Sequence, residues 1–181
     1  MNYQDVLDFW FNPETQPVWF AKSDAFDQLI QDKFSAVHTQ AAQAELWSWR
    51  KTAEGRLAEI IVLDQFSRNL FRDQAHAFAQ DALALALAQE AISLDLDLDK
   101  QLSPEQRTFL YMPFMHSESK LIHEFALKLF QRLGNPLNLD YEKKHKIIID
   151  RFGRYPHRNH ILARRSTAEE LEFLTQPNSS F

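Results

Sequence analysis

The stretch GRLAEIIVLDQFSRNLFR, residues 55–72, decides the fold class. Its run Ile60–Leu63 places apolar side chains around the whole circumference of a helix, and a helix that is apolar on all sides is usually central and buried. Apolar residues recur at three- and four-residue steps over most of the remaining chain, and only 3 glycines and 7 prolines are present. The sequence therefore predicts an all-α protein with this segment at its centre.

Helix-capping residues mark the neighbouring helices. The residues expected to start helices are Ser23, Ser103, Ser117, Asp140 and Ser166, and those expected to end them are Gly134 and Gly153. Ser103 and Ser166 each open a capping box with the glutamine or glutamate three residues later. Pro113 is expected to break or kink a helix. The alanine-rich segment 75–91 permits close helix packing, and the short alternating run 93–100 is interpreted as a connection.

The chain of 181 residues is long enough for one domain with a sizeable core, and its 15 phenylalanines and 4 tryptophans would fill much of that core. No linker rich in glycine, serine or proline divides it. We therefore predict a single domain, 1–181, with seven to eight helices joined by short loops as antiparallel pairs in a compact array. The aromatic triplets FWF and VWF are expected to pack the loop NPETQP between them onto the core.

The composition excludes several classes of protein. The chain has no cysteine, which removes disulfides, thiol nucleophiles and thiolate metal sites. It has no signal-peptide pattern at its start and no apolar run near the roughly 18 residues that span a bilayer. A net charge of −5 disfavours binding to nucleic acid. We expect a cytoplasmic protein that binds neither nucleic acid nor membranes, and an oligomer is compatible with the sequence.

The apolar stripe of residues 55–72 runs onto charged positions. It continues onto Asp64 and then Arg68, and Arg72 follows one turn later. A buried charge without a partner is very costly, so each of these side chains needs one. Two interpretations stay open: a structural ion-pair network, or a preorganised polar pocket inside a helical array.

A second polar group follows Pro113. His116 and Glu118, with His123 further on, combine imidazole and carboxylate groups that could bind zinc or iron, or act as a general acid and base. Their spacing matches no strong metal signature, so we predict no tightly bound metal or other cofactor and expect a hydrogen-bonded structural pair. His145 lies inside an apolar stripe and is expected to be a core histidine.

The segment RFGRYPHRNHILARRST, residues 151–167, carries five arginines and two histidines but no acidic residue. Gly153 is suited to end a helix, and Tyr155 before a proline favours an extended backbone, so the sequence predicts an arginine-rich loop. The loop side chains expected to lie together are Arg154, His157, Arg158 and Asn159.

Part of this positive charge is expected to be internal. Asp64 and Glu118 are the carboxylates that most need cations. We expect Arg158 or Arg154 to reach one of them, and Arg158 with Asp64 is the preferred pair. The other cations are left to face solvent or a ligand.

Three segments, LDQFSRNLFR (63–72), YMPFMHSE (111–118) and FGRYPHRN (152–159), resemble a bacterial family catalogued as domain of unknown function 924. The resemblance covers essentially the whole chain, implies a helical fold similar to tetratricopeptide-repeat proteins, and implies no established reaction. The family-like positions are Asp64, Arg68, Asn69, Arg72, His116, Glu118, Arg154, Pro156, His157, Arg158 and Asn159.

Two residues depart from the family pattern. His123 stands where the resemblance implies a glutamine, which weakens any metal site that includes it. Ala163 stands where a glycine usually precedes Arg164, so we expect the turn there to be helical or less tight.

The sequence favours a non-enzymatic, helical binding module. Its arginine-rich loop would take an anionic group of a small molecule or peptide, because a guanidinium binds carboxylate or phosphate through two parallel hydrogen bonds. One alternative is a hydrolase-type enzyme that uses a His/Glu acid–base pair or a metal. A second alternative is a structural or oligomeric scaffold in which every charge is paired internally.

Overall fold

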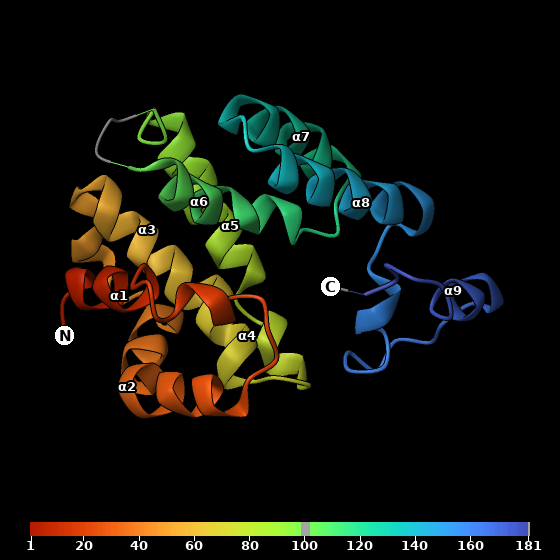
Figure 1. The fold of residues 1–181 in the computed structure, drawn as a ribbon, viewed down its shortest axis with the longest axis horizontal. Coiled ribbons are helices and arrows are strands. Elements are labelled where there is room, and N and C mark those ends of the chain that lie inside the picture. The colour runs from red at the N-terminus through yellow and green to blue at the C-terminus, as the bar shows by residue number, and fades with distance from the viewer. Residues whose placement is uncertain (99–101, 181) are drawn as a thin grey trace. The chain divides into compact units, whose positions relative to one another are not determined.

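The computed structural model describes residues 1–98 and 102–180. The regular elements in this part of the chain are all helical, which confirms the all-α fold (Figure 1). Packing divides the chain into two compact units: unit 1 comprises Met1–Arg72 and His76–Pro113, and unit 2 comprises Asp73–Ala75 and Phe114–Phe181. The single domain stays a prediction, which the cooperativity of unfolding would test.

The helices of unit 1 are α1 (Tyr3–Trp10), α2 (Asp24–Ala42), α3 (Ala53–Ile61), α4 (Ser67–Leu70), α5 (Asp81–Ser93) and α6 (Pro104–Met115), the last of which ends just beyond the boundary. Unit 2 contains α7 (Lys120–Leu133), α8 (Pro136–Phe152) and α9 (Ala168–Phe173). The π-turn Val62–Phe66 joins α3 to α4 without a break. With α3 and α4 taken as one rod, the described residues form eight helices, within the predicted range.

The segment α3–α4 forms the centre of unit 1, as predicted. The side chains of Ile60–Leu63 are 0% exposed. Helix α3 packs against α1 and α5, and α5 contributes the buried alanines Ala84, Ala88 and Ala91. Small side chains let two helices approach closely, which explains the alanine-rich sequence there. Truncation of a central apolar residue such as Ile61 to alanine is expected to cost about 2–5 kcal/mol.

The π-turn inside this rod was not predicted. Its wider winding frees backbone carbonyls, and side chains of the next turn bind two of them. Ser67 Oγ donates to the carbonyl of Leu63 at 2.6 Å, and Arg68 Nη1 donates to that of Asp64 at 2.7 Å. Apolar spacing alone does not distinguish this winding from an α-helix. π-turns occur often at functional sites, and this one contains the polar residues Asp64 and Gln65.

Several predicted helix boundaries are confirmed. Ser23 caps α2, and Ser103 forms its capping box with Gln106 at the start of α6. Gly134 and Gly153 end α7 and α8 with φ angles of +77° and +69°, in the left-handed region that glycine tolerates best.

Four boundary predictions are wrong. The expected break at Pro113 is absent: helix α6 continues through it to Met115, because a proline removes only one intrahelical hydrogen bond and the flanking turns hold the helix. The α7 cap is Ser119 instead of Ser117. Helix α8 begins four residues before Asp140, where Asn135 caps it and the next residue is a proline suited to the first turn.

The fourth concerns α9, whose capping box is Thr167 with Glu170, one residue later than the predicted pair at Ser166. The run 93–100 is a connection as far as Leu98, and its last two residues lie outside the described part of the chain.

Unit 2 is built on the hairpin of α7 and α8, which two residues connect and which therefore runs antiparallel. Its apolar core contains Ile148, Ile149 and Tyr155, with Phe152 and Phe173 packed against them. His145 is a core histidine, as predicted: its Nδ1 lies 2.8 Å from the carbonyl of Tyr141 one turn earlier. Burial lowers the pKa of His145 to about 3, so the ring is neutral at neutral pH.

In unit 1 the aromatic residues of FWF and VWF pack together as expected. Trp10 and Trp19 stack at 5.8 Å between ring centroids, and the Trp19 indole N–H donates to the carbonyl of Trp10 at 2.8 Å. Both rings contact Phe109 of α6, which fixes the first loop to the core.

Candidate functional site

The π-turn of unit 1 holds a buried carboxylate against a guanidinium. Asp64 is 1% exposed, and its Oδ1 lies 3.0 Å from Arg68 Nη1. The same guanidinium binds both oxygens of Asp81 on α5 at 3.0 and 3.1 Å, and it lies 5.7 Å from the Phe78 ring centroid. Gln65 Nε2 donates to the second oxygen of Asp64 at 2.5 Å. These contacts form an ion-pair network that links three segments of unit 1.

The next turn of α4 is tied to α2 through Asp27. Asn69 donates to Asp27 Oδ1 at 2.8 Å, and Arg72 donates from Nε and Nη2 to both oxygens at 2.5 and 2.8 Å. Although burial works against the charged form, these hydrogen bonds hold the pKa of Asp27 below its usual value. Asp27 and Asp81 were not predicted as partners, because no local sequence pattern connects residues that are 13 to 45 positions apart.

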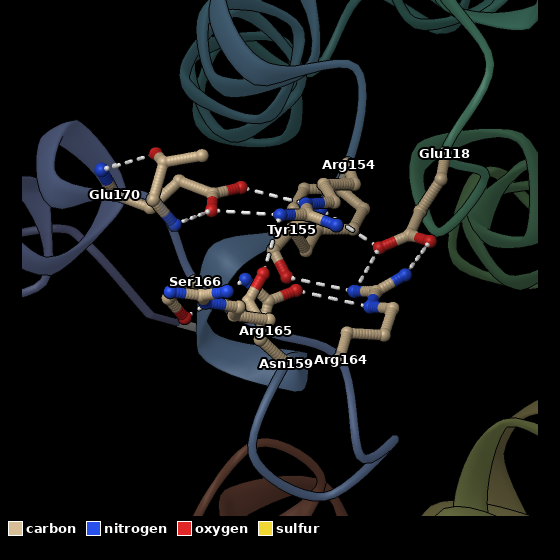
Figure 2. Close-up of polar contacts among 9 residues, drawn as sticks. Glu118, Arg154, Tyr155, Asn159, Arg164, Arg165, Ser166 and Glu170 are labelled. Atoms are coloured by element: carbon tan, nitrogen blue, oxygen red, sulfur yellow. Dashed lines mark hydrogen bonds and ion pairs between the residues drawn. The ribbon is translucent and has the colours of Figure 1, made fainter.

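In unit 2, three donors converge on the carboxylate of Glu118 (Figure 2). Arg164 donates from Nη1 to Oε2 at 2.5 Å and from Nη2 to Oε1 at 2.9 Å, and the backbone N–H of Tyr155 donates to Oε1 at 2.7 Å. Burial opposes the charged form, but these bonds hold the pKa of Glu118 below its usual value, with a smaller contribution from the charge of Arg158. We call these donors, with Glu118, the Glu118 cradle.

A second carboxylate, Glu170 of α9, receives Arg154 (Figure 2). Arg154 donates from Nε and Nη2 at 2.6 and 2.8 Å, and the backbone N–H of Thr167 donates at 2.7 Å. The hydrogen bonds from Arg154 lower the pKa of Glu170 to about 2. The Glu170 side chain is only 3% exposed, whereas that of Glu118 is 26% exposed. The Glu118 cradle is therefore the more accessible of the two.

The turn before Arg164 brings that arginine to the cradle. The N–H groups of Ala163 and Arg164 donate to the carbonyls of His160 and Asn159 at 3.2 and 2.8 Å, which is the pattern of a Schellman turn. Ala163 has a φ angle of +52°. The expectation of a helical or less tight turn is wrong: the tight left-handed turn is present, with alanine in the place that glycine would occupy at lower cost.

Asn159 connects the turn to the cradle from inside the loop. It is 1% exposed, accepts from Arg164 Nε at 2.9 Å and donates to Ser166 Oγ at 3.1 Å (Figure 2). Arg158 is also buried, with its guanidinium carbon 4.5 Å from the Tyr155 ring centroid. Burial, followed by the charge of Arg158, lowers the pKa of His157 to about 4. The loop thus directs the side chains of Asn159 and Arg158 toward the interior of unit 2.

The structure brings some of the sequence-predicted residues together within each unit. In unit 1, Arg68 joins Asp64, and Arg72 joins Asn69 through Asp27. In unit 2, Glu118 meets Arg164, and Arg154 meets Glu170. His116 is half-buried, and its charge contributes to the low pKa of His145. The pairing of Arg158 with Asp64 stays a prediction.

Arg164 and Glu170 belong to these ion pairs but were not among the predicted site residues. Both lie in the quoted arginine-rich region or directly after it, and Glu170 carries a recognisable signal, because a capping box placed one residue later would have ended on it. Within residues 1–98 and 102–180, no cluster of three or more histidine, aspartate or glutamate side chains could hold a metal ion. No helix in that part of the chain is long and apolar enough to cross a membrane.

A family model described as bacterial protein of unknown function (DUF924) matches residues 6–178. The chain belongs to this family. Among solved structures, a protein of unknown function from Agrobacterium tumefaciens has 42% sequence identity and a TM-score of 0.89, over 95% of this chain and 96% of that one. No curated protein matches the chain. The DUF924 chain thus shares its fold and about two-fifths of its sequence with that neighbour.

Proposed function

We propose that this DUF924 protein is a helical, tetratricopeptide-like binding module that takes an anionic group, a carboxylate or phosphate of a small molecule or peptide, at the Glu118 cradle. The observation that carries the proposal is the convergence of two guanidinium N–H groups and one backbone N–H on a single, partly exposed carboxylate. Glu118 occupies the place that the anionic group of the ligand would take.

The cradle suits an external anion because its donors are already oriented. Arg164 is held by Asn159 at Nε and by the carbonyl of Tyr155 at Nη2, so its two terminal nitrogens form a fixed fork at the Glu118 carboxylate. A preorganised fork loses little entropy when it exchanges one carboxylate for another. Glu118 lies between α6 and α7, outside both helices, so its side chain can leave without unwinding a helix.

The local charge also favours an anion. Residues 151–167 contain five arginines, and three carboxylates pair with them: Glu118, Glu169 and Glu170. Arg165 is among the exposed residues of this segment. Its guanidinium adds positive charge to the surface of the segment that carries Arg164, and positive charge attracts anions.

Nuclear magnetic resonance (NMR) tests the proposal with inorganic phosphate and with acetate, each titrated at constant ionic strength. We expect saturable shifts of the Arg164 Nε–H and Tyr155 amide signals, with a Kd on the order of millimolar. Arg164→Gln should abolish the saturable shifts. Arg151→Gln is the matched control, because Arg151 pairs with Glu169 in an exposed position of the same unit. Signals at the cradle that do not move, or that move equally in both variants, would contradict the proposal.

A scaffold is the second candidate, because Arg154 forms a bidentate pair with the buried carboxylate of Glu170 and so ties the segment after α8 to α9. A hydrolase that uses Glu118 as a base gains less support. The bonds from Arg164 and Tyr155 lower the pKa of Glu118, and burial keeps His157 neutral. A carboxylate with a low pKa is a weak base at neutral pH.

A further inference from the structure

The interior of unit 2 contains a histidine and a glutamate that are both 0% exposed, His123 of α7 and Glu142 of α8. His123 Nδ1 lies 2.8 Å from Glu142 Oε1. The other ring nitrogen, Nε2, lies 2.9 Å from the carbonyl oxygen of Ser117 and 3.2 Å from the hydroxyl of Tyr155. That hydroxyl donates to the carbonyl of Met115 at 2.5 Å.

The donors and acceptors of this network fix the number of its protons. Tyr155 donates its single hydroxyl proton to the carbonyl of Met115. The carbonyl of Ser117 has no proton to donate, so the hydrogen bond between it and His123 requires a proton on His123 Nε2. A neutral imidazole then has a bare lone pair at Nδ1, which faces a carboxyl oxygen at 2.8 Å. One more proton must lie between Nδ1 and Oε1, because two lone pairs at that distance repel each other.

The second oxygen of Glu142 decides where that proton resides. Oε2 is buried and has no hydrogen-bond partner among the described residues. A carboxylate would leave half of its negative charge there without a donor from the described residues, which is costly in a low-dielectric interior. In the acid form, Oε2 is an ordinary carbonyl oxygen and tolerates the lack of a partner much better. Burial accordingly raises the pKa of Glu142, against opposing effects of His123 and Lys146.

We infer that Glu142 is protonated at neutral pH and donates to a neutral His123, and that this neutral dyad positions Tyr155 at the Glu118 cradle. The positioning part rests on the proposed function. Through its ring, Tyr155 is bound to the dyad; through its backbone, it donates to Glu118 and accepts from Arg164 Nη2 at 3.1 Å. One residue thus links the interior of unit 2 to the cradle.

Other charged groups around the dyad both raise and lower the pKa of Glu142. Lys146 favours the carboxylate and Asp150 disfavours it, but Lys146 also pairs with Asp150 and with Glu124, which reduces its effect on the interior. The titratable and charged groups that act on the dyad or contact Tyr155 are Lys146, Asp150 and His145 of α8, His157 and Arg158 of the loop, and Glu118 and Arg164 of the cradle.

Heteronuclear NMR of the full chain tests the proton assignment directly. We expect the Glu142 carboxyl carbon to resonate as a carboxylic acid at pH 7, and the His123 ring to be neutral with its proton on Nε2. A carboxylate signal from Glu142, with either form of His123, would overturn the inference. This measurement does not depend on any ligand, so it stands apart from the test of the proposed function.

Two variants test the positioning role. Glu142→Gln keeps a donor for His123 Nδ1, so the Tyr155 amide shift and the phosphate Kd should stay within about twofold of the wild-type values. Glu142→Ala removes the donor, and we expect a displaced Tyr155 amide signal and about tenfold weaker phosphate binding. Asp140→Asn, at an exposed position of the same helix, is the control and should change neither quantity.

The outcomes separate the two proposals. If Glu142→Gln displaces Tyr155 as strongly as Glu142→Ala does, Glu142 is not a donor and the inference is wrong. If wild-type protein binds no phosphate, while Glu142 is protonated and the Tyr155 amide responds only to Glu142→Ala, the proposed function fails and the dyad is supported. Should Glu142→Ala unfold the protein, Glu142→Gln and the carbon shift still decide the matter.

Discussion

The two units place the partners of their arginines differently. In unit 1, Arg68 binds carboxylates in the central rod and on α5, and the carboxylate bound by Arg72 is on α2. In unit 2, Arg154 and Arg164 lie in the segment between α8 and α9, outside its 3₁₀-helix Pro156–Arg158, and Glu118 lies in the connection between α6 and α7.

This difference indicates which charges are structural. A carboxylate fixed on a packed helix cannot leave without disturbing that helix, so the unit 1 network serves stability. A carboxylate in a connection can exchange with another anion at lower cost, because loop backbones rearrange more easily than packed helices. We therefore propose that the Asp64 network stabilises unit 1 and that the Glu118 cradle binds the anion.

The largest expected effect is in unit 1. Asp64→Ala removes the buried partner of Arg68 and of Gln65, and we expect a loss of about 3–5 kcal/mol in the free energy of unfolding. Asp81→Ala is the matched control, since Asp81 binds the same arginine from a more exposed position and should cost about 1 kcal/mol. Urea unfolding measures both. Equal losses would show that burial of Asp64 does not set its importance.

Acid is expected to weaken unit 2 more than unit 1. A histidine in the unfolded chain takes up a proton below about pH 6.5. In the folded protein, His157 and His145 stay neutral until the pH falls to their lowered pKa values of about 4 and about 3. The unfolded state therefore binds more protons, and stability falls as the pH falls. Each histidine contributes about 1.4 kcal/mol per pH unit, which gives about 3 kcal/mol between pH 6.5 and 5.

Two other groups enter this comparison. Burial also lowers the pKa of His38 in unit 1, so unit 1 should lose stability with a shallower slope. Burial raises the pKa of Glu142 in unit 2, and a raised pKa favours the folded state as the pH falls, so Glu142 offsets part of the loss from His145 and His157.

The tryptophans separate the responses of the two units. All four, at positions 10, 19, 47 and 49, lie in unit 1, so their fluorescence follows that unit while circular dichroism follows both. At pH 5 we expect the circular dichroism transition to occur at lower urea concentration than the fluorescence transition. Transitions that coincide at every pH would contradict a difference between the units and would support the predicted single domain.

A smaller effect is expected at the turn before Arg164. Ala163→Gly should stabilise the protein by about 1 kcal/mol, because glycine adopts the left-handed conformation of this position without strain. Ala86→Gly, at an exposed position inside α5, should destabilise by a similar amount. Thermal unfolding measures these two opposite changes in stability. A loss of stability in both Ala163→Gly and Ala86→Gly would mean that the backbone at residue 163 is not strained.

The smallest effect is expected for the exposed pair of Arg151 and Glu169, whose side chains are 44% and 60% exposed. Arg151→Gln should change the free energy of unfolding by less than about 0.5 kcal/mol, because solvent screens such pairs. A larger loss in urea unfolding would mean that the surface arginines of unit 2 are structural, like those of unit 1.

The sequence predicted the fold class and the central rod because both depend on local apolar spacing. It predicted the core role of His145 for the same reason. It missed the π-turn, because a single wider turn leaves the apolar spacing almost unchanged. It also missed Asp27 as the partner of Arg72 and Arg164 as the partner of Glu118, because these pairs join residues about 45 positions apart and tertiary packing alone brings them together.

The most direct test of the account is the phosphate affinity of Glu118→Gln, measured at fixed ionic strength beside Glu169→Gln. Each variant removes one negative charge from the same unit, but only Glu118 occupies the cradle. Because a tethered carboxylate competes at high effective concentration, Glu118→Gln should bind phosphate about tenfold more tightly than wild type. Glu169→Gln should stay within about twofold of it. Equal affinities in the two variants, or weaker binding by Glu118→Gln, would contradict the assignment of an anion site to the Glu118 cradle.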